Sequence, residues 1–313
     1  MKGGCRIGAK GQRSFYMRLR PYFGILAALA MSSGALADDE VKQPTSREII
    51  EATSPNDWRP LDPENTLYLD LPAGKIVIEL RPDFAPKHVQ RIKELTREKF
   101  YDGIVFHRVI EGFMAQGGDP TGTGTGSSEK PNLEAEFTRD AGEVEGLNVI
   151  GRDRIAPRIG YVDGMPVAAQ PEALRTFIKD SRVDLWPVHC PGVMSMARAT
   201  DPNSANSQFF LMIGDSRLNL DKRYTGWGWI VDGFEASRRI VRGEPPVRPT
   251  PIIRARIAAD VPESERDNIK VLKTGNPVFL QYLKAAGQVN DTGLVKDICE
   301  IRVPIKKDGK IEL

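Results

Sequence analysis

Cysteine is scarce in this sequence, with only 3 among 313 residues. Cys5 lies in an N-terminal segment that we expect to be removed, which leaves Cys190 and Cys299 in the rest of the chain. Folds that depend on a disulfide framework are much richer in cysteine, so a hydrophobic core must hold this protein together. A bridge between Cys190 and Cys299 and a pair of free, partly buried thiols are both compatible with the sequence.

Long hydrophobic runs are also missing, and none approaches the roughly 20 residues that a membrane-spanning helix needs. The apolar stretch at residues 22–31 follows a basic region without acidic residues and precedes Ala35, Leu36 and Ala37. This order predicts a secretory signal peptide, residues 1–37, cleaved before Asp38. Met17 would be a more ordinary start, and an uncleaved interfacial helix is the alternative. We expect an exported protein, in a bacterial periplasm, with no membrane span.

The sequence lacks an excess of basic charge once the signal peptide is set aside. Of the 44 Lys plus Arg and 42 Asp plus Glu, six basic and no acidic residues lie in residues 1–37. The remainder carries 38 against 42, a net charge of about −4. A phosphate-binding surface needs a basic footprint, so we expect no nucleic-acid partner.

Several common catalytic signatures are absent. We find no serine hydrolase elbow or zinc-protease motif, and His88 and His189 lack partners at metal-ligand spacing. The glycine-rich residues 122–126 match neither a dinucleotide fingerprint nor a phosphate-binding loop. We therefore expect neither a metal nor a cofactor.

Composition shifts divide the chain into parts, because it is longer than a typical single domain. The predicted parts are a signal peptide at 1–37, a lead-in at 38–64, a domain at 65–261 with an insertion at about 138–190, and a C-terminal extension at 262–313.

Periodicity within the domain predicts mostly strands. Residues 67–71 and 75–80 alternate as a β-hairpin, and a helix begins at Pro86 with Val89, Ile92 and Leu95 on one face. A second helix is expected from Gly233 to near Gly243. Further short strands are expected at 104–109, 192–197, 208–213, 226–231 and 252–258. Many short strands with few helices favour a closed β-barrel.

The remaining parts fit this barrel less well. We expect the lead-in to be loosely ordered apart from a short helix at 46–52, and the insertion to contain one helix near 171–179. The extension is predicted as a small α/β tail. Its helices are expected at 263–273 and 277–286, before a hairpin of residues 298–305 and 310–313 that turns at residues 307–309.

Two segments carry the chemistry. Residues 106–119 place Arg108 among apolar residues that include Phe113 and Met114. A guanidinium in such surroundings requires an acceptor, which is either a structural ion-pair partner or a ligand. The second segment, residues 192–210, contains the runs Gly-Val-Met-Ser-Met-Ala-Arg-Ala and Asn-Ser-Gln-Phe-Phe.

Together the two segments strongly resemble the cyclophilin family. The resemblance runs from about Asn65 to Asp260, less the insertion, and includes Leu220, Asp221 and residues 224–228. It implies a mainly β fold, a closed eight-stranded antiparallel β-barrel capped by two helices, with a groove that binds Xaa-Pro peptides. Proline-containing polypeptides are the implied partners, and the insertion or the tail could bind a further protein.

The resemblance also implies roles for individual residues. Arg108 matches the catalytic arginine and Gln116 the glutamine that positions it. Phe113 is grouped with these catalytic residues and matches the apolar pocket that holds the proline ring. Met114, Phe210 and Leu220 match the apolar proline pocket, and Tyr224 matches its rim. Ala197 and Arg198 match the strand edge that pairs with the peptide backbone, and Gln208 matches a further residue of the groove. Asn219 departs from the family, which often has an aromatic residue there, so tight binding of cyclosporin-type ligands is not expected.

Physical chemistry agrees with these roles. Rotation about an Xaa-Pro bond crosses a resonance barrier of roughly 18–20 kcal/mol. An apolar pocket that holds the ring, and a donor that stabilises the twisted amide, lower this barrier without a nucleophile. We predict a peptidyl-prolyl cis-trans isomerase that assists the folding of exported proteins. The alternatives are a proline-peptide binding or chaperone module with little turnover and, more weakly, a structural role.

Overall fold

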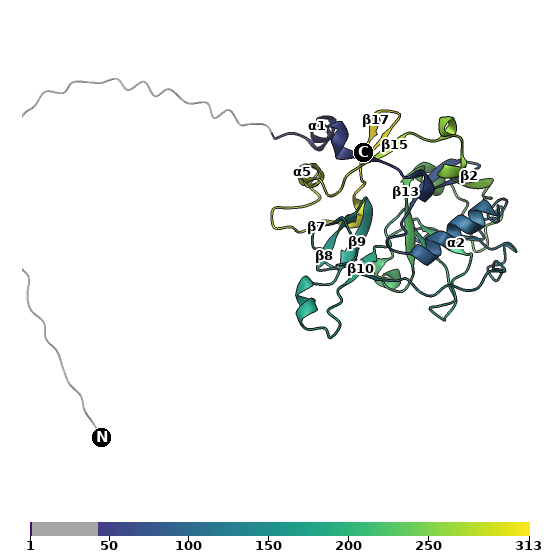
Figure 1. Ribbon diagram of the computed structural model, residues 1–313, viewed down its shortest axis with the longest axis horizontal. Coiled ribbons are helices and arrows are strands. Elements are labelled where there is room, and N and C mark those ends of the chain that lie inside the picture. Colours follow the sequence, from purple (N-terminus) through teal and green to yellow (C-terminus); the bar gives the residue numbers. More distant parts are fainter. Residues whose placement is uncertain (2–42) are drawn as a thin grey trace, which may run out of the picture. The chain divides into compact units, whose positions relative to one another are not determined.

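The computed structural model describes Met1 and residues 43–313 (Figure 1). The predicted signal peptide, its cleavage site before Asp38 and the alternative start at Met17 lie outside the described residues. Within residues 43–313, no helix combines the length and the hydrophobicity that crossing a bilayer requires.

The largest sheet is antiparallel and contains eight strands. Its first hairpin is the one predicted from alternation, with Leu71 opposite Gly74 at the turn. The order across the sheet is β14 (Arg254–Ile257), β2 (Thr66–Leu71), β3 (Gly74–Leu80), β13 (Gly226–Asp232), β11 (Val193–Met196), β12 (Phe209–Met212), β5 (Met114–Gly117) and β4 (Arg108–Ile110).

This sheet has two edges, β14 and β4, and no ladder joins them. The segments before these strands meet at a single bridge between Val105 and Pro251, next to a hydrogen bond from the Phe106 amide to the Thr250 carbonyl (2.9 Å). Pro249 and Pro251 lack the amide hydrogen that a continuous ladder needs. The expected closed barrel is therefore not confirmed, and the sheet is an open half-barrel.

Two helices pack near this sheet. In α2 (Pro86–Arg97), the predicted residues Val89, Ile92 and Leu95 are buried in the hydrophobic cluster on the inner face of the eight-stranded sheet, which we call the main core. The second helix, α4 (Phe234–Arg238), is shorter than expected. Arg242 donates hydrogen bonds to carbonyls at the end of α4, at Arg238 and Ile240, and so satisfies groups that a longer helix would bond internally. A short helix, α3 (Arg217–Leu220), precedes β13.

The insertion forms a sheet of its own, where the sequence predicted one helix. A 3₁₀ helix at Glu172–Thr176 stands where that helix was expected. The three central strands of this sheet, at residues 158–162, 165–169 and 184–187, are buried on both faces and lack alternation, which hid them from the periodicity search. The order is β6 (Arg139–Asp140), β10 (Asp184–Pro187), β9 (Met165–Ala169), β8 (Arg158–Val162) and β7 (Leu147–Gly151).

The third sheet joins the lead-in to the tail, in the order β1 (Trp58–Pro60), β15 (Ile269–Leu272), β16 (Ile305–Lys307) and β17 (Lys310–Glu312). The lead-in is thus more ordered than expected, with α1 (Ser46–Glu51) as predicted and β1 paired to β15. The helix predicted at 263–273 is wrong, because pairing on both sides makes Ile269–Leu272 a strand. The predictions of α5 (Pro277–Ala285) and of the 307–309 turn are confirmed. The first strand of that hairpin is shorter than the expected 298–305, because residues 298–300 form a 3₁₀ helix and the strand begins at Ile305.

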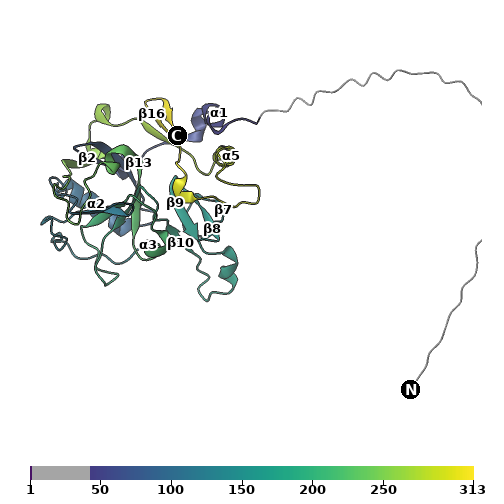
Figure 2. The ribbon, with the colours of Figure 1, turned by 180° about the vertical axis from the view of Figure 1, so that it is seen from behind.

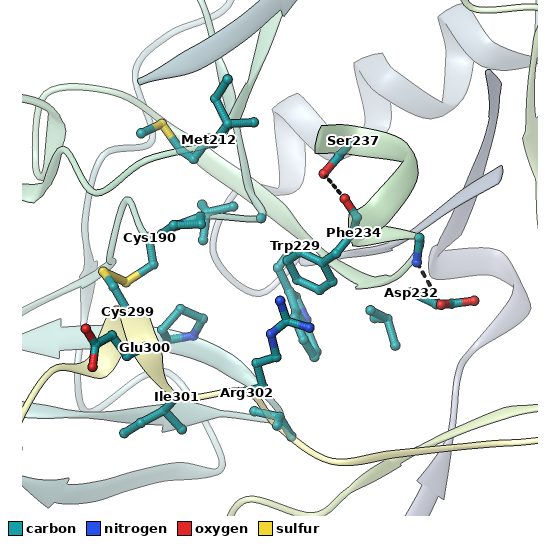
Figure 3. Close-up of a pocket in the computed structure, with 18 of the residues that line it drawn as sticks. Cys190, Met212, Trp229, Asp232, Phe234, Ser237, Cys299, Glu300, Ile301 and Arg302 are labelled. Carbon is teal, nitrogen blue, oxygen red and sulfur yellow. Dashed lines mark hydrogen bonds between the residues drawn. A yellow bond between two sulfur atoms is a disulfide. The ribbon is translucent and has the colours of Figure 1, made fainter. Parts of the chain in front are cut away.

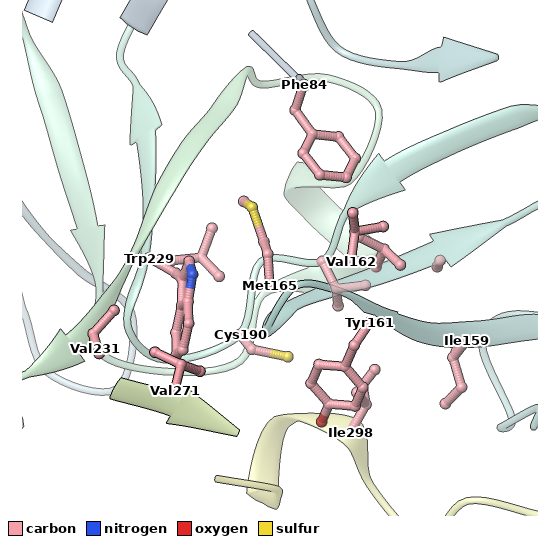
Figure 4. Close-up of a cluster of buried hydrophobic side chains, with 14 of the residues drawn as sticks. Phe84, Ile159, Tyr161, Val162, Met165, Cys190, Trp229, Val231, Val271 and Ile298 are labelled. Atoms are coloured by element: carbon pink, nitrogen blue, oxygen red, sulfur yellow. The ribbon is translucent and has the colours of Figure 1, made fainter. Parts of the chain in front are cut away.

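The second and third sheets lie side by side on one flank of the eight-stranded sheet (Figures 1 and 2). One continuous cluster of buried side chains includes Trp229 from the large sheet, Tyr161 from the insertion and Ile298 from the tail (Figure 4). Shared burial of this kind makes the lead-in, insertion and tail part of one packed unit with the domain.

A disulfide bond between Cys190 and Cys299 ties the tail to the start of β11, which settles the alternative that the sequence left open. The two residues lie on the wall of a cavity of about 730 Å³, between the large sheet and the tail (Figure 3). This cavity does not contain Arg108, so it is separate from the site described next.

Candidate active site

Strand register brings four residues into one row. Arg108 of β4 lies opposite Gln116 of β5, Gln116 lies opposite Phe210 of β12, and Phe210 lies opposite Ser195 of β11. Directly opposed residues carry their side chains on the same face of a sheet, and their sequence neighbours point to the other face. The neighbours belong to the main core: Val109, Ala115, Phe209 and Met194. The row is therefore on the outer face of the sheet.

Apolar side chains flank this row. Met114, Phe210 and Leu220 are buried, and Phe113 and Tyr224 are half-buried, all within one hydrophobic cluster. The Tyr224 ring meets the Phe210 ring edge to face, with centroids 5.6 Å apart. Among the residues that the sequence assigned to the proline pocket and its rim, register places Met114 and Phe210 on one sheet face, and Tyr224 contacts Phe210. Phe113 and Leu220 belong to the same large buried cluster.

The Phe113 backbone is held from two sides. Its amide donates to the Ile110 carbonyl (3.1 Å), and its carbonyl accepts from the amides of Ile213 (2.9 Å) and Gly214 (3.0 Å). These bonds fix the backbone that carries the Phe113 ring.

Arg108 lies at the open end of the row, with 40% of its side chain exposed. Its Nε donates to Glu244 Oε2 (2.8 Å), and its terminal nitrogen NH1 lies 4.0 Å from Met114 Sδ. Sequence reasoning did not identify Glu244, because Glu244 follows α4 and no local pattern links it to β4.

Gln116 lies beside Arg108, as the register requires, but its side chain bonds elsewhere. Its Nε2 donates to Gln208 Oε1 (2.8 Å), and Gln208 Nε2 donates to the carbonyls of Gly124 (3.0 Å) and Gly126 (2.8 Å). The two glutamines thus connect the arginine row to the glycine-rich turn.

Asp119 organises that turn. Its carboxylate accepts hydrogen bonds from the amides of Thr121 (2.7 Å), Gly126 (3.1 Å) and Gly124. Burial alone would raise the pKa of Asp119, but the bonds from Thr121, Gly126 and Gly124 outweigh it and lower the pKa to about 2. An internal carboxylate therefore occupies the amides that a bound phosphate would require.

The predicted backbone-pairing edge carries Ala197 and Arg198. The Ala197 amide donates to the Gln208 carbonyl (2.9 Å). The Arg198 guanidinium lies over the Tyr224 ring, 4.5 Å from its centroid, and donates to the Arg223 carbonyl. The Arg198 side chain thus holds the Tyr224 loop and does not face the apolar pocket.

A buried polar chain lies behind the pocket. His189 Nδ1 is 2.8 Å from Asp221 Oδ1, and His189 Nε2 is 2.9 Å from Ser195 Oγ. Ser195 is 0% and His189 1% exposed, so this serine cannot reach a substrate as a hydrolase nucleophile does. Both ring nitrogens of His189 have partners, which leaves neither for a metal.

The other two histidines differ from each other. His88 Nδ1 contacts Glu136 Oε2 (2.7 Å), and the His88 side chain is buried in α2. His107 is buried next to Arg108, and neither ring nitrogen has a partner within the described residues. Burial lowers the pKa of His107, with Asp119 opposing the shift and Arg108 adding to it. His107 therefore favours its neutral form.

Comparison with known proteins places this geometry in a family. A family model described as "Cyclophilin type peptidyl-prolyl cis-trans isomerase/CLD" matches residues 66–257. A probable peptidyl-prolyl cis-trans isomerase of Brucella suis is 36% identical over 215 residues, which are 64% of this chain and 85% of the relative. Peptidyl-prolyl cis-trans isomerase ppi1 of Schizosaccharomyces pombe is 33% identical over 187 residues, 58% of this chain and 92% of the relative.

Among solved structures, cyclophilin AquaCyp293 from Hirschia baltica is similar with a TM-score of 0.70 and 34% identity, over 84% of this chain and 96% of that chain. This coverage exceeds residues 66–257, so the likeness extends into the additions around the domain. Sequence, fold and the arginine row thus agree: the chain belongs to the cyclophilin-type peptidyl-prolyl cis-trans isomerase family.

Proposed function

We propose that this chain isomerises Xaa-Pro bonds of exported polypeptides and thereby assists their folding. One observation carries the proposal. Arg108 lies on the same outer sheet face as the apolar side chains of Met114 and Phe210, and part of its guanidinium is open to solvent. Phe113 lies on the turn between β4 and β5, directly before Met114. A proline ring fits an apolar pocket, and the neighbouring cation can then reach the amide that precedes the ring.

The chemistry requires only binding and charge. As the amide twists, the proline nitrogen regains its lone pair, and a donor at that position is bonded more strongly in the twisted state than in the planar state. Arginine suits this role because it donates without giving up its proton. Phe113 and Phe210 hold the ring while the acyl side rotates.

Two observations support export. The order of basic, apolar and small residues in 1–37 is that of a signal peptide. The Cys190–Cys299 bond belongs to a type that persists in oxidising compartments such as the bacterial periplasm. N-terminal sequencing of the native protein should begin at Asp38. Residues 1–37 retained on a cytoplasmic protein would refute this part of the proposal.

The decisive test compares Arg108→Ala with Phe113→Ala. Loss of a donor that acts in the twisted state should lower kcat/KM for a proline peptide by about 100- to 1000-fold, with little change in peptide Kd. Phe113→Ala should weaken binding as well as rate, because the pocket holds ground and transition states alike.

Arg182→Ala is a matched control for the arginine. Arg182 is similarly exposed (45%) and donates through Nε to a carboxylate, Asp184 (2.9 Å), but it lies in the insertion. It should keep wild-type activity. A folded Arg108→Ala variant with full activity would place the site elsewhere. Measurable peptide binding without turnover in the wild type would instead favour a binding or chaperone module.

A further inference from the structure

Glu244 is brought to Arg108 by the backbone and not by a chance side-chain contact. The Val109 amide donates to the Gly243 carbonyl (2.8 Å), and the Gly243 amide donates to the Val109 carbonyl (2.9 Å). In an antiparallel bridge, the residue before one partner lies opposite the residue after the other. Arg108 and Glu244 are therefore cross-strand neighbours, close enough for their side chains to meet.

The bridge also depends on a glycine. Gly243 has φ +148°, and a Cβ atom there would lie 2.4 Å from the Cα of Pro246. The rings of Pro245 and Pro246 restrict φ at the two residues after Glu244. The backbone that carries Glu244 is thus stiff, which lowers the entropy lost when its carboxylate holds a partner.

The contact engages one particular edge of the guanidinium. Glu244 Oε2 accepts from Nε at 2.8 Å, while NH1 has only the weak contact with Met114 Sδ, and NH2 donates no hydrogen bond to residues 43–313. Gln116 does not compete for this role, since its amide donates to Gln208.

We propose that Glu244 is a positioning residue for the isomerase reaction: it holds Nε of Arg108 so that the terminal nitrogens face the prolyl amide. The inference rests on the proposed function. Glu244 is 51% exposed, and exposed ion pairs contribute little to stability. Glu244 therefore contributes mainly by orienting the Arg108 donor. The reaction rate depends steeply on this orientation, whereas the stability of the fold depends on it little.

The test measures kcat/KM and peptide Kd for Glu244→Ala and Glu244→Gln. Glu244→Ala should lower kcat/KM by about five- to tenfold, with unchanged Kd and an unchanged denaturation midpoint. Glu244→Gln retains an oxygen that accepts from Nε and should restore at least half of the wild-type rate.

Glu111→Ala is the matched control. Glu111 is an exposed carboxylate on the β4–β5 turn, and it pairs with Arg242 Nε at 2.6 Å instead of with Arg108. We expect wild-type kcat/KM for this variant.

A double-mutant comparison tests the coupling directly. In an Arg108→Lys background, which lacks Nε, Glu244→Ala should have no further effect on kcat/KM, because the two residues act as one unit.

The inference fails if Glu244→Ala keeps or exceeds the wild-type rate, since the carboxylate would then be idle or would compete with substrate. It also fails if Glu244→Gln is as slow as Glu244→Ala, or if the loss persists in the Arg108→Lys background. These outcomes are distinct from failure of the proposed function, in which the wild type itself shows no turnover or Arg108→Ala keeps full activity.

Discussion

Removal of the Cys190–Cys299 bond should cost much of the stability and little of the activity. The double variant Cys190→Ser/Cys299→Ser opens a covalent loop whose ends are 109 residues apart in sequence. That loop contains four of the eight strands of the large sheet, β11, β12, β13 and β14. The bond therefore restricts the unfolded chain over a long segment.

The magnitude follows from the loop length. In the chain-entropy account, a disulfide that closes a loop of about 100 residues raises the free energy of unfolding by about 4.7 kcal/mol at 25 °C. Removal of a native disulfide typically lowers the free energy of unfolding by about 2–5 kcal/mol. We expect a decrease of about 3–5 kcal/mol in the free energy of unfolding, seen as a urea midpoint lower by about 1–2 M. Activity on a proline peptide should stay within about twofold, because the bond does not line the Arg108 row.

Urea denaturation with and without dithiothreitol measures this effect. The wild type should lose stability on reduction, whereas the double serine variant should be indifferent to the reductant and match the reduced wild type. Cys299 is half-buried, and the bond borders the cavity in Figure 3. Two titratable thiols in the native, unreduced protein, or an unchanged midpoint on reduction, would refute the reasoning.

Three further expectations concern the site. Turnover should be nearly flat between about pH 6 and 9, because an arginine donor works without losing a proton and burial lowers the pKa of His107; a bell-shaped profile centred near neutrality would contradict the arginine mechanism. Cyclosporin should inhibit weakly and Asn219→Trp should tighten it, since the exposed Asn219 offers no indole face; tight inhibition of the wild type, unimproved by the substitution, would show that the position is misassigned. Because the pKa of Asp119 is lowered to about 2 in the folded protein, its ionised carboxylate stabilises the fold at pH values above the ordinary aspartate pKa of about 3.9. This stabilisation is lost as pH falls towards 2. Asp119→Asn should therefore unfold more easily than wild type at neutral pH, with the difference shrinking below pH 4 in chemical denaturation; an equal difference at both pH values would mean that the carboxylate charge is not what stabilises the turn.

Local patterns were enough to predict several elements. The β2–β3 hairpin, the buried face of α2 and the turn at residues 307–309 each depend on neighbours within one element. The pocket residues could be named because motifs near Phe113 and Phe210 are long and ordered. Strand register then places Met114 and Phe210 on one sheet face.

Other features depend on partners far away in the sequence. Strand β1 exists because it pairs with β15, and residues 269–272 are a strand and not the predicted helix for the same reason. Closure of the large sheet was expected from the number of strands. It depends, however, on the backbone amide hydrogens that the proline-rich segment before β14 can donate to a ladder.

The same distinction holds within the site. The sequence by itself determined that Arg108 stands on a strand among apolar neighbours and therefore needs an acceptor, since burying a guanidinium is costly without one. Only the tertiary structure decided that the acceptor is Glu244, 136 residues later, and that Gln116 bonds Gln208. The physical reason is that the local sequence shows which polar groups need a partner. The identity of that partner depends on which distant strands pair and in what register, and this is set by the packing of the whole chain.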